Sequence, residues 1–415
     1  MKLTLDGVIM EPNQDMQGYK INEVDTTTAV NPSQPTKFSG FSGNEMYCLN
    51  LVGFTPGNLL VGNSVFSMGF IGSVGSSIKT FIGGEIKQVT NMIAEGRRLS
   101  LNRFNDELAA SGGVGASGVT SELIFHDGNI EFLTVGSTIH SESAPNQGQF
   151  TSSADGQELF CQIDSNYSPL GFVFGNVAYS NGFAKGILGS IRQLAKGEVR
   201  QYSDIFNTTR NIALERIIDE AKSKNANSIV GIRTSILPVG TNGVQEMIMI
   251  GTASYNEQIV NIANTVGGVT TSDLTAEETW SVAKMGYAPL KLVLGTSVYS
   301  LGFIGGVTSM IKNLVKGEIN ELTQLIYGAR EQSLKKLQSE AEALGADDIL
   351  GIKTYIYNLG SGLIEFLAIG TAVRKVEGIS PKSDQLPPQA IISDKDTFTN
   401  TADFGYGTNL QNPKR

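Results

Sequence analysis

Three sets of charged residues recur at matched positions of the chain, and they are the side chains best suited to chemistry. They are the arginines Arg97, Arg210 and Arg330, the glutamates Glu131, Glu246 and Glu365, and a second glutamate set, Glu85, Glu198 and Glu318. A recurrent arginine can pair with a glutamate, bind an anion or assist catalysis. No histidine or cysteine lies beside these residues to complete an acid–base pair. We therefore favour a structural or interface ion pair over anion binding and catalysis.

The sequence gives little support for a metal site or a catalytic nucleophile. The chain has two histidines, His126 and His140, and two cysteines, Cys48 and Cys161. Soft metals need thiolate or imidazole ligands at close spacing, and no such cluster is present. The cysteines lie 113 residues apart at one shared repeat position, which we interpret as a buried strand position. We expect no catalytic residue, no metal and no cofactor.

The matched spacing comes from a threefold internal repeat. The repeat aligns without gaps from Gly62, Gly175 and Gly295 to Gly118, Gly231 and Gly351. A fixed period is the signature of repeated modules. The sequence predicts five parts: an N-terminal extended arm (1–42), modules at 43–140, 156–255 and 277–375, and a flexible C-terminal tail (376–415). Ser/Thr/Gly-rich flexible linkers are expected at 141–155 and 261–276.

Each module is predicted to have the order β-α-α-β-β. A strand region interrupted by proline (Pro56, Pro169 or Pro289) leads into a short helix, expected at 66–81, 179–194 and 299–314. A longer amphipathic helix begins at Glu85, Glu198 or Glu318, where an acidic residue suits the helix dipole. It ends before Gly112, Asn225 or Gly345, which are residues typical of left-handed caps. Two strands that form a hairpin finish the module.

The short helices carry residues that are identical in all copies. These are Gly69, Gly182 and Gly302 with Phe70, Phe183 and Phe303. Small residues allow backbones to approach closely, and phenylalanine supplies buried area. We expect these residues, like the glycines at the ends of the repeat, to be structural. An interfacial membrane helix is the alternative, and its few basic residues disfavour it.

Composition narrows the possible partners. The net charge of −9 and the scattered Lys and Arg residues argue against nucleic-acid binding. No signal peptide and no apolar run of about 20 residues is present. We expect a cytoplasmic protein without membrane association.

Several motifs in the third module resemble those of the YbjQ-like family, described as heavy-metal-binding proteins. They are Gly-Thr-x-x-Tyr near the end of the first strand, Lys-Gly-Glu, Ala329-Arg330, Ala343-Leu-Gly-Ala-Asp-Asp-Ile-Leu-Gly351 and Ile369-Gly-Thr-Ala372. The resemblance covers all three modules. It implies small mixed α/β domains that assemble as pentameric rings. The chain departs from the family pattern where Gly-Gly-Arg is expected between the helices, because it has Gly-Glu there.

Together these observations predict an α+β protein of three tandem YbjQ-like modules in a ring- or propeller-type assembly. The function expected is a non-catalytic homo-oligomeric scaffold, built as a ring stack, tube or cage from a multiple of five chains. The alternative is a small-ligand or metal-binding oligomer with sites at intermodule clefts containing Arg97, Arg210 and Arg330.

Overall fold

The computed structural model describes residues 36–67, 69, 84–126, 128–142, 149–180, 197–240, 244–300, 320–360 and 363–387. The chain divides into two units, Met1–Lys37 and Phe38–Arg415, and all helices and strands below belong to the second. The expected short helices lie almost entirely outside the described residues, together with Gly182, Gly302, Phe70, Phe183 and Phe303. So do most of the expected arm and the tail beyond residue 387.

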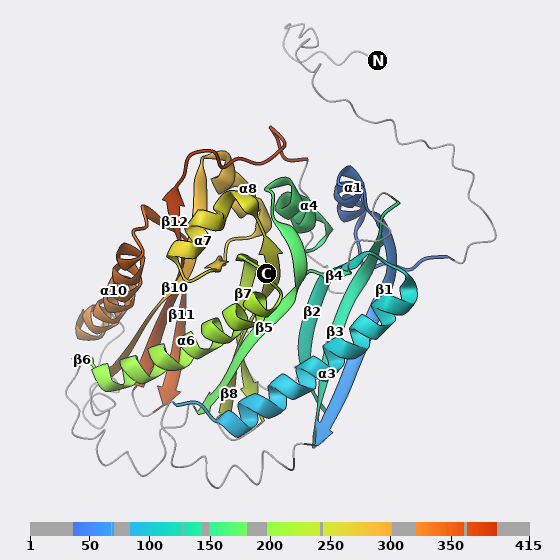
Figure 1. The fold of residues 1–415 in the computed structure, drawn as a ribbon. Coiled ribbons are helices and arrows are strands. Elements are labelled where there is room, and N and C mark those ends of the chain that lie inside the picture. The colour runs from blue at the N-terminus through green and yellow to red at the C-terminus, as the bar shows by residue number, and fades with distance from the viewer. Residues whose placement is uncertain are drawn as a thin grey trace, which may run out of the picture. The chain divides into compact units, whose positions relative to one another are not determined.

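The second unit is a mixed α+β structure in which one set of elements occurs three times (Figure 1). Each set has a short helix, a long strand, a long helix and two strands forming a hairpin. The first set is α1 (Gly43–Leu51), β1 (Thr55–Ser67), α3 (Lys87–Ser111), β2 (Gly115–His126) and β3 (Asn129–His140). The second is α4 (Gly156–Asp164), β5 (Ser168–Ser180), α6 (Arg200–Ser223), β7 (Ser228–Val239) and β8 (Val244–Tyr255). The third is α8 (Ala276–Lys284), β10 (Tyr287–Ser300), α10 (Asn320–Ala343), β11 (Asp348–Gly360) and β12 (Leu363–Lys375).

The short helix that opens each module was not expected from the sequence. Each begins with a capping box, in which the N-cap side chain and a glutamate three residues later bond each other's backbone N–H. The pairs are Ser42 with Glu45, Asp155 with Glu158, and Thr275 with Glu278. The predicted order β-α-α-β-β is therefore wrong at its start, and the repeated Ser/Asp/Thr-x-x-Glu pattern was the signal for the helix.

These opening helices also hold the cysteines. Cys48 lies in α1 and Cys161 in α4, both buried and both free thiols, so the expected strand position is wrong. Burial is the main cause that raises the pKa of Cys48 to about 11, and the carboxylates of Asp155, Glu277 and Glu45 add to it. Burial likewise raises the pKa of Cys161.

Both thiols will therefore resist alkylation in the folded protein. With a pKa of about 11, about one Cys48 thiol in a thousand is ionised at pH 8, and the thiolate is the reactive form. Mass spectrometry after iodoacetamide treatment will show an unmodified chain, whereas the same treatment in guanidinium will add two groups. Rapid labelling of the native protein at pH 8 would contradict this packing.

The first strand of each module is longer than expected. A register shift follows Pro56, Pro169 and Pro289, as the proline positions predict. The strands then run on through Phe66, Tyr179 and Tyr299, where the short helices were expected to begin. Those helix starts are wrong because the strands stay paired with β3, β8 and β12 over their whole length.

The long helices end as predicted. Gly112, Asn225 and Gly345 have left-handed φ values of 67°, 58° and 66°. Helices α3 and α6 begin two residues later than expected, because Glu85 and Glu198 form strand-like bridges. Glu85 is bridged to Tyr179, and Glu198 belongs to β6 (Gly197–Glu198), which pairs with β10.

The segments between modules are partly structured. In the first, β4 (Phe150–Thr151) pairs with β2 in parallel. The second contains η1 (Glu257–Ile259), α7 (Val260–Thr265) and β9 (Thr270–Thr271), which pairs with β7. The flexible coil expected for the second linker is therefore wrong. The resulting sheets have the orders β1-β3-β2-β4, β5-β8-β7-β9 and β11-β12-β10-β6.

The beginning of the expected tail packs on the second module. Lys382 N–H donates to the Asp164 carbonyl at 2.8 Å, and Ser383 Oγ donates to Asp164 Oδ1 at 2.7 Å. The flexible tail predicted from residue 376 therefore begins too early. No helix among the described residues is long and apolar enough to cross a membrane.

Candidate functional site: the joints between modules

Successive modules are connected by the long helix of one module packing on the first strand of the next. Helix α3 packs on its own β1 and on β5, and α6 packs on its own β5 and on β10 (Figure 1). We call the contact of the first module with the second joint 1, and that of the second with the third joint 2. The same structural element therefore serves both a module's own core and its neighbour.

A buried ion pair lies at the centre of each joint. In joint 1, Arg97 Nη2 lies 2.7 Å from Glu246 Oε2 and Arg97 Nε lies 3.2 Å from Glu246 Oε1. In joint 2, Arg210 Nη2 lies 2.6 Å from Glu365 Oε1. All four side chains are at most 1% exposed. Two of the three recurrent arginines thus meet glutamates of the first recurrent glutamate set across modules.

The two joints surround their arginines differently. Arg210 lies 5.1 Å from the ring centroid of Tyr179, 5.8 Å from that of Phe206 and 5.7 Å from that of Tyr357, within the range of cation–π contacts. Burial opposes the charge of Arg210, but the Glu365 carboxylate and the Tyr179 hydroxyl together outweigh burial and raise the pKa of the guanidinium. In joint 1, Arg97 Nη1 instead donates to the Ser121 carbonyl at 2.8 Å.

A hydroxyl on each helix accepts a backbone hydrogen bond from the next module. The Ala178 N–H donates to Thr90 Oγ1 at 2.9 Å in joint 1, and the Val298 N–H donates to Ser203 Oγ at 2.8 Å in joint 2. The carbonyls of the same two strand residues also accept hydrogen bonds across the joints. The Ile86 N–H, just before α3, donates to the Ala178 carbonyl at 2.7 Å, and the Val199 N–H, just before α6, donates to the Val298 carbonyl at 2.8 Å. Buried backbone groups of β5 and β10 are thereby satisfied across the joints.

A second ion pair borders each joint. Arg216 Nη2 lies 2.7 Å from Glu85 Oε1, and Lys336 Nζ lies 2.9 Å from Glu198 Oε1. These glutamates precede their helices and bind cations of the next module. The helix dipole expected to explain Glu85 and Glu198 is thus not their main interaction, and Glu318 lies outside the described residues.

The remaining members of the main charged sets do not meet within the chain. Arg330 is exposed on α10 and forms no ion pair with any described residue. Glu131 accepts from Asn63 Nδ2 at 3.1 Å and lies 2.7 Å from His126 Nε2. The expectation that no histidine lies beside the recurrent charged residues is therefore wrong for Glu131. The hydrogen bond with His126 lowers the pKa of Glu131.

The glycines that begin the repeat lie where strand and helix touch. A Cβ on Gly62, Gly175 or Gly295 would come 2.1, 2.1 or 1.9 Å from a helix carbonyl, that of Ser100, Ala213 or Ser333 respectively. They occupy the middle of the strands, so their expected place near the strand ends is wrong.

The glycines that close the repeat have a backbone role. Gly118, Gly231 and Gly351 have φ values of 67°, 66° and 64°, and the hairpin register shifts beside each of them. That conformation favours glycine over other residues. Gly69 lies just beyond β1, and a Cβ there would come no closer than 3.5 Å to another atom, Ser67 Oγ.

Sequence reasoning missed a fourth recurrent charged set. Glu107, Glu220 and Glu340 accept the N–H groups of Val61, Phe174 and Leu294 at 3.1, 3.0 and 3.0 Å. Each carboxylate bonds the first strand of its own module. The same two offsets, 113 and 120 residues, would have revealed them.

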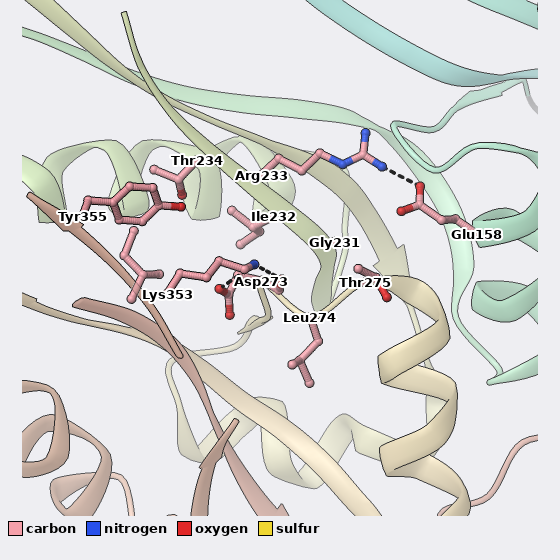
Figure 2. A pocket seen from close by; sticks show the side chains of 11 residues that line it. Glu158, Gly231, Ile232, Arg233, Thr234, Asp273, Leu274, Thr275, Lys353 and Tyr355 are labelled. Atoms are coloured by element: carbon pink, nitrogen blue, oxygen red, sulfur yellow. Dashed lines mark hydrogen bonds and ion pairs between the residues drawn. The ribbon is translucent and has the colours of Figure 1, made fainter. Parts of the chain in front are cut away.

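A pocket of about 220 Å³ lies between the second and third modules (Figure 2). Two ion pairs border it, Arg233 with Glu158 at 2.6 Å and Lys353 with Asp273 at 3.2 Å. Its volume is below the 300–1,000 Å³ typical of ligand sites. Neither Arg97 nor Arg210 lines it, and both are buried in the ion pairs of the joints.

Ligands for a metal do not gather in the part of the chain that the structure describes. No group of three or more His, Cys, Asp or Glu side chains there could hold a metal ion. Among the recurrent charged residues that the structure describes, all but Arg330 form ion pairs or hydrogen bonds instead.

Comparison with known proteins gives these joints a family context. The family model described as "Putative heavy-metal-binding" matches residues 164–257 and 277–376, which are nearly the whole second and third modules. A UPF0145 protein of Thermotoga petrophila is 39% identical over 90 residues, which is 22% of this chain and 84% of that protein. A UPF0145 protein of Thermoplasma volcanium is 29% identical over 120 residues, or 27% of this chain and 98% of that protein.

A longer relative spans more than one module. An encapsulin nanocompartment protein of Mycobacterium tuberculosis is 29% identical over 242 residues. The match covers 56% of this chain and 89% of that protein. A length of 242 residues exceeds any single module, so the similarity includes the connection between modules.

Proposed function

We propose, from the premise that this chain belongs to the YbjQ-like family shared by the UPF0145 proteins, that it is a self-assembling structural subunit without catalysis of its own. It would build a homo-oligomeric scaffold in the form of a ring stack, tube or cage. The relative of Mycobacterium tuberculosis, named as an encapsulin nanocompartment protein, supports a compartment-type particle.

The observation that carries this proposal is the joint itself. One arrangement of long helix, first strand and buried Arg–Glu pair is used twice in succession within the chain. An interface that can be repeated between identical folds is the basic requirement for assembly from many modules. Its ion pairs are desolvated and doubly hydrogen-bonded between arginine and glutamate, which favours one specific geometry.

The charges also support a role without catalysis. The joints bury two ion pairs, Arg97 with Glu246 and Arg210 with Glu365, whose side chains are at most 1% exposed. Acid–base or nucleophilic chemistry needs a reactive group that a substrate can reach. The recurrent residues therefore serve structure better than reaction.

Two further features belong to this proposal. The family resemblance suggests a particle whose chain number is a multiple of five. The two free, buried cysteines suit a reducing compartment, which supports a cytoplasmic location.

Native mass tests the proposal directly. Mass photometry and negative-stain imaging of the purified full chain will show a discrete particle well above the 44.3 kDa of one chain. A multiple of five chains would support the ring stack. A stable monomer at all accessible concentrations would contradict self-assembly.

A further inference from the structure

The third module exposes a helix face that the first two modules bury. Arg330 lies at the α10 position that Arg97 occupies in α3 and Arg210 in α6. Both equivalents are at most 1% exposed, whereas Arg330 is exposed. Thr323, at the position of the hydroxyls of Thr90 and Ser203, is likewise exposed. We call this the donor face of the chain.

The first module exposes the complementary strand face. Val61 and Val65 of β1 are 43% and 57% exposed. The residues at the same two positions are buried in the joints, Phe174 and Ala178 on β5 and Leu294 and Val298 on β10. Glu131, the counterpart of Glu246 and Glu365, lies on the neighbouring strand β3, where Val65 pairs with it. We call this the acceptor face.

The acceptor face already has the internal geometry of a joint. Asn63 Nδ2 lies 3.1 Å from Glu131 Oε1, and Asn176 Nδ2 lies 3.1 Å from Glu246 Oε1 in joint 1. Arg103 donates to the Asn63 carbonyl, as Arg216 donates to that of Asn176 at 2.7 Å. The side chains that orient Glu131 are therefore already in position in the single chain, without a helix of another copy packed on this face.

We propose that the donor face of one copy docks on the acceptor face of a second copy and forms a third joint of the same kind. Arg330 of one chain then pairs with Glu131 of the next, and the Val65 N–H donates to the Thr323 hydroxyl. This inference rests on the proposed self-assembly and specifies its contact. His126, which bonds Glu131 in the single chain, shares that carboxylate or yields it to Arg330.

Such a contact is continuous with the interface already inside the chain. The third joint would have the same contacts as joints 1 and 2, so the row of modules continues from one copy into the next. Because the donor and acceptor faces are different surfaces, the contact is head-to-tail. A head-to-tail contact of this type closes into a ring or extends as a helical filament. It also covers β1, which is the edge strand of the first module's sheet.

Charge reversal on either face tests the third joint. Arg330→Glu and Glu131→Arg each place like charges in the joint while the opposite face stays intact. Lys335→Glu is the matched control, because Lys335 is exposed on the same helix and its counterparts Asn102 and Glu215 are exposed beside the two internal joints. Native mass, analytical ultracentrifugation and circular dichroism are measured for the three full-length variants and for an equimolar mixture of the first two.

We expect both reversals to leave the circular dichroism unchanged and to weaken chain association by about 100-fold or more. Lys335→Glu will assemble like the natural chain. The mixture will regain association, because Arg330 of the Glu131→Arg chain meets Glu131 of the Arg330→Glu chain. A complex of two chains, or a larger particle built on that pair, supports the third joint.

Three results would overturn the proposed third joint. If both reversal variants assemble like the natural chain, the donor and acceptor faces are not in contact, and self-assembly proceeds through other surfaces. If the reversals weaken assembly but the mixture stays apart, the two charges do not face each other. A natural chain that is itself monomeric would remove both this contact and the proposed function.

Discussion

Replacing Arg210 with methionine will destabilise the folded chain by about 3–5 kcal/mol, because it leaves the Glu365 carboxylate buried without its partner. Guanidinium unfolding can be followed by the fluorescence of Trp280, the single tryptophan, which lies in α8 of the third module and donates to Asp164 of the second module at 2.7 Å. The unfolding midpoint will fall, and the third module will lose structure first.

Two matched variants separate the ion pair from simple loss of a side chain. Arg200→Met changes the same residue type on the same helix, but its side chain is 88% exposed, so the free energy of unfolding will change by less than about 0.5 kcal/mol. Arg210→Met combined with Glu365→Leu removes both charges and will recover most of the loss. An unchanged midpoint for Arg210→Met alone would mean that joint 2 does not depend on this pair.

Gly175→Ala will destabilise the second module by about 3 kcal/mol or more. The new Cβ would lie 2.1 Å from the Ala213 carbonyl oxygen and 2.6 Å from Ile217 N, both backbone atoms of α6. The helix must move away from β5, and it carries Arg210 with it. Differential scanning calorimetry will therefore show a lower unfolding temperature, and joint 2 will weaken together with the module core.

Gly43→Ala is the control for this substitution. Gly43 begins α1, has nothing within 4 Å of an added Cβ and does not have a positive φ. Its replacement will leave the unfolding temperature unchanged or raise it slightly, since alanine favours helix. A similar loss from both substitutions would show that glycine flexibility, and not the close strand–helix contact, sets the effect.

The repeat made much of the fold predictable, because copies of one module could be compared. The left-handed caps at Gly112, Asn225 and Gly345 and the strand irregularities at the prolines depend on local backbone chemistry, which the sequence displays directly. The opening helices were missed because the cysteine position that α1 and α4 share was interpreted as part of a strand. Their capping boxes, such as Thr275 with Glu278, are visible only when the segments between modules are also aligned.

The sequence predicted which charged residues form the joints, but it did not predict which residue pairs with which. Recurrence identified Arg97 and Glu246, but no periodicity in the chain shows that the glutamate comes from the following module. The assignment of Glu198 to the helix dipole failed for a related reason. Its partner, Lys336, is 138 residues away and reaches it only because the modules pack side by side.

The order of the modules in one polypeptide has a consequence for how the particle responds to dilution. In a row built from these chains, two of every three joints form between covalently linked modules, at an effective concentration set by the short linkers. Those two joints stay closed however dilute the protein becomes. Only the proposed joint between chains would follow mass action, so each chain would enter and leave such a particle as a prefolded three-module block.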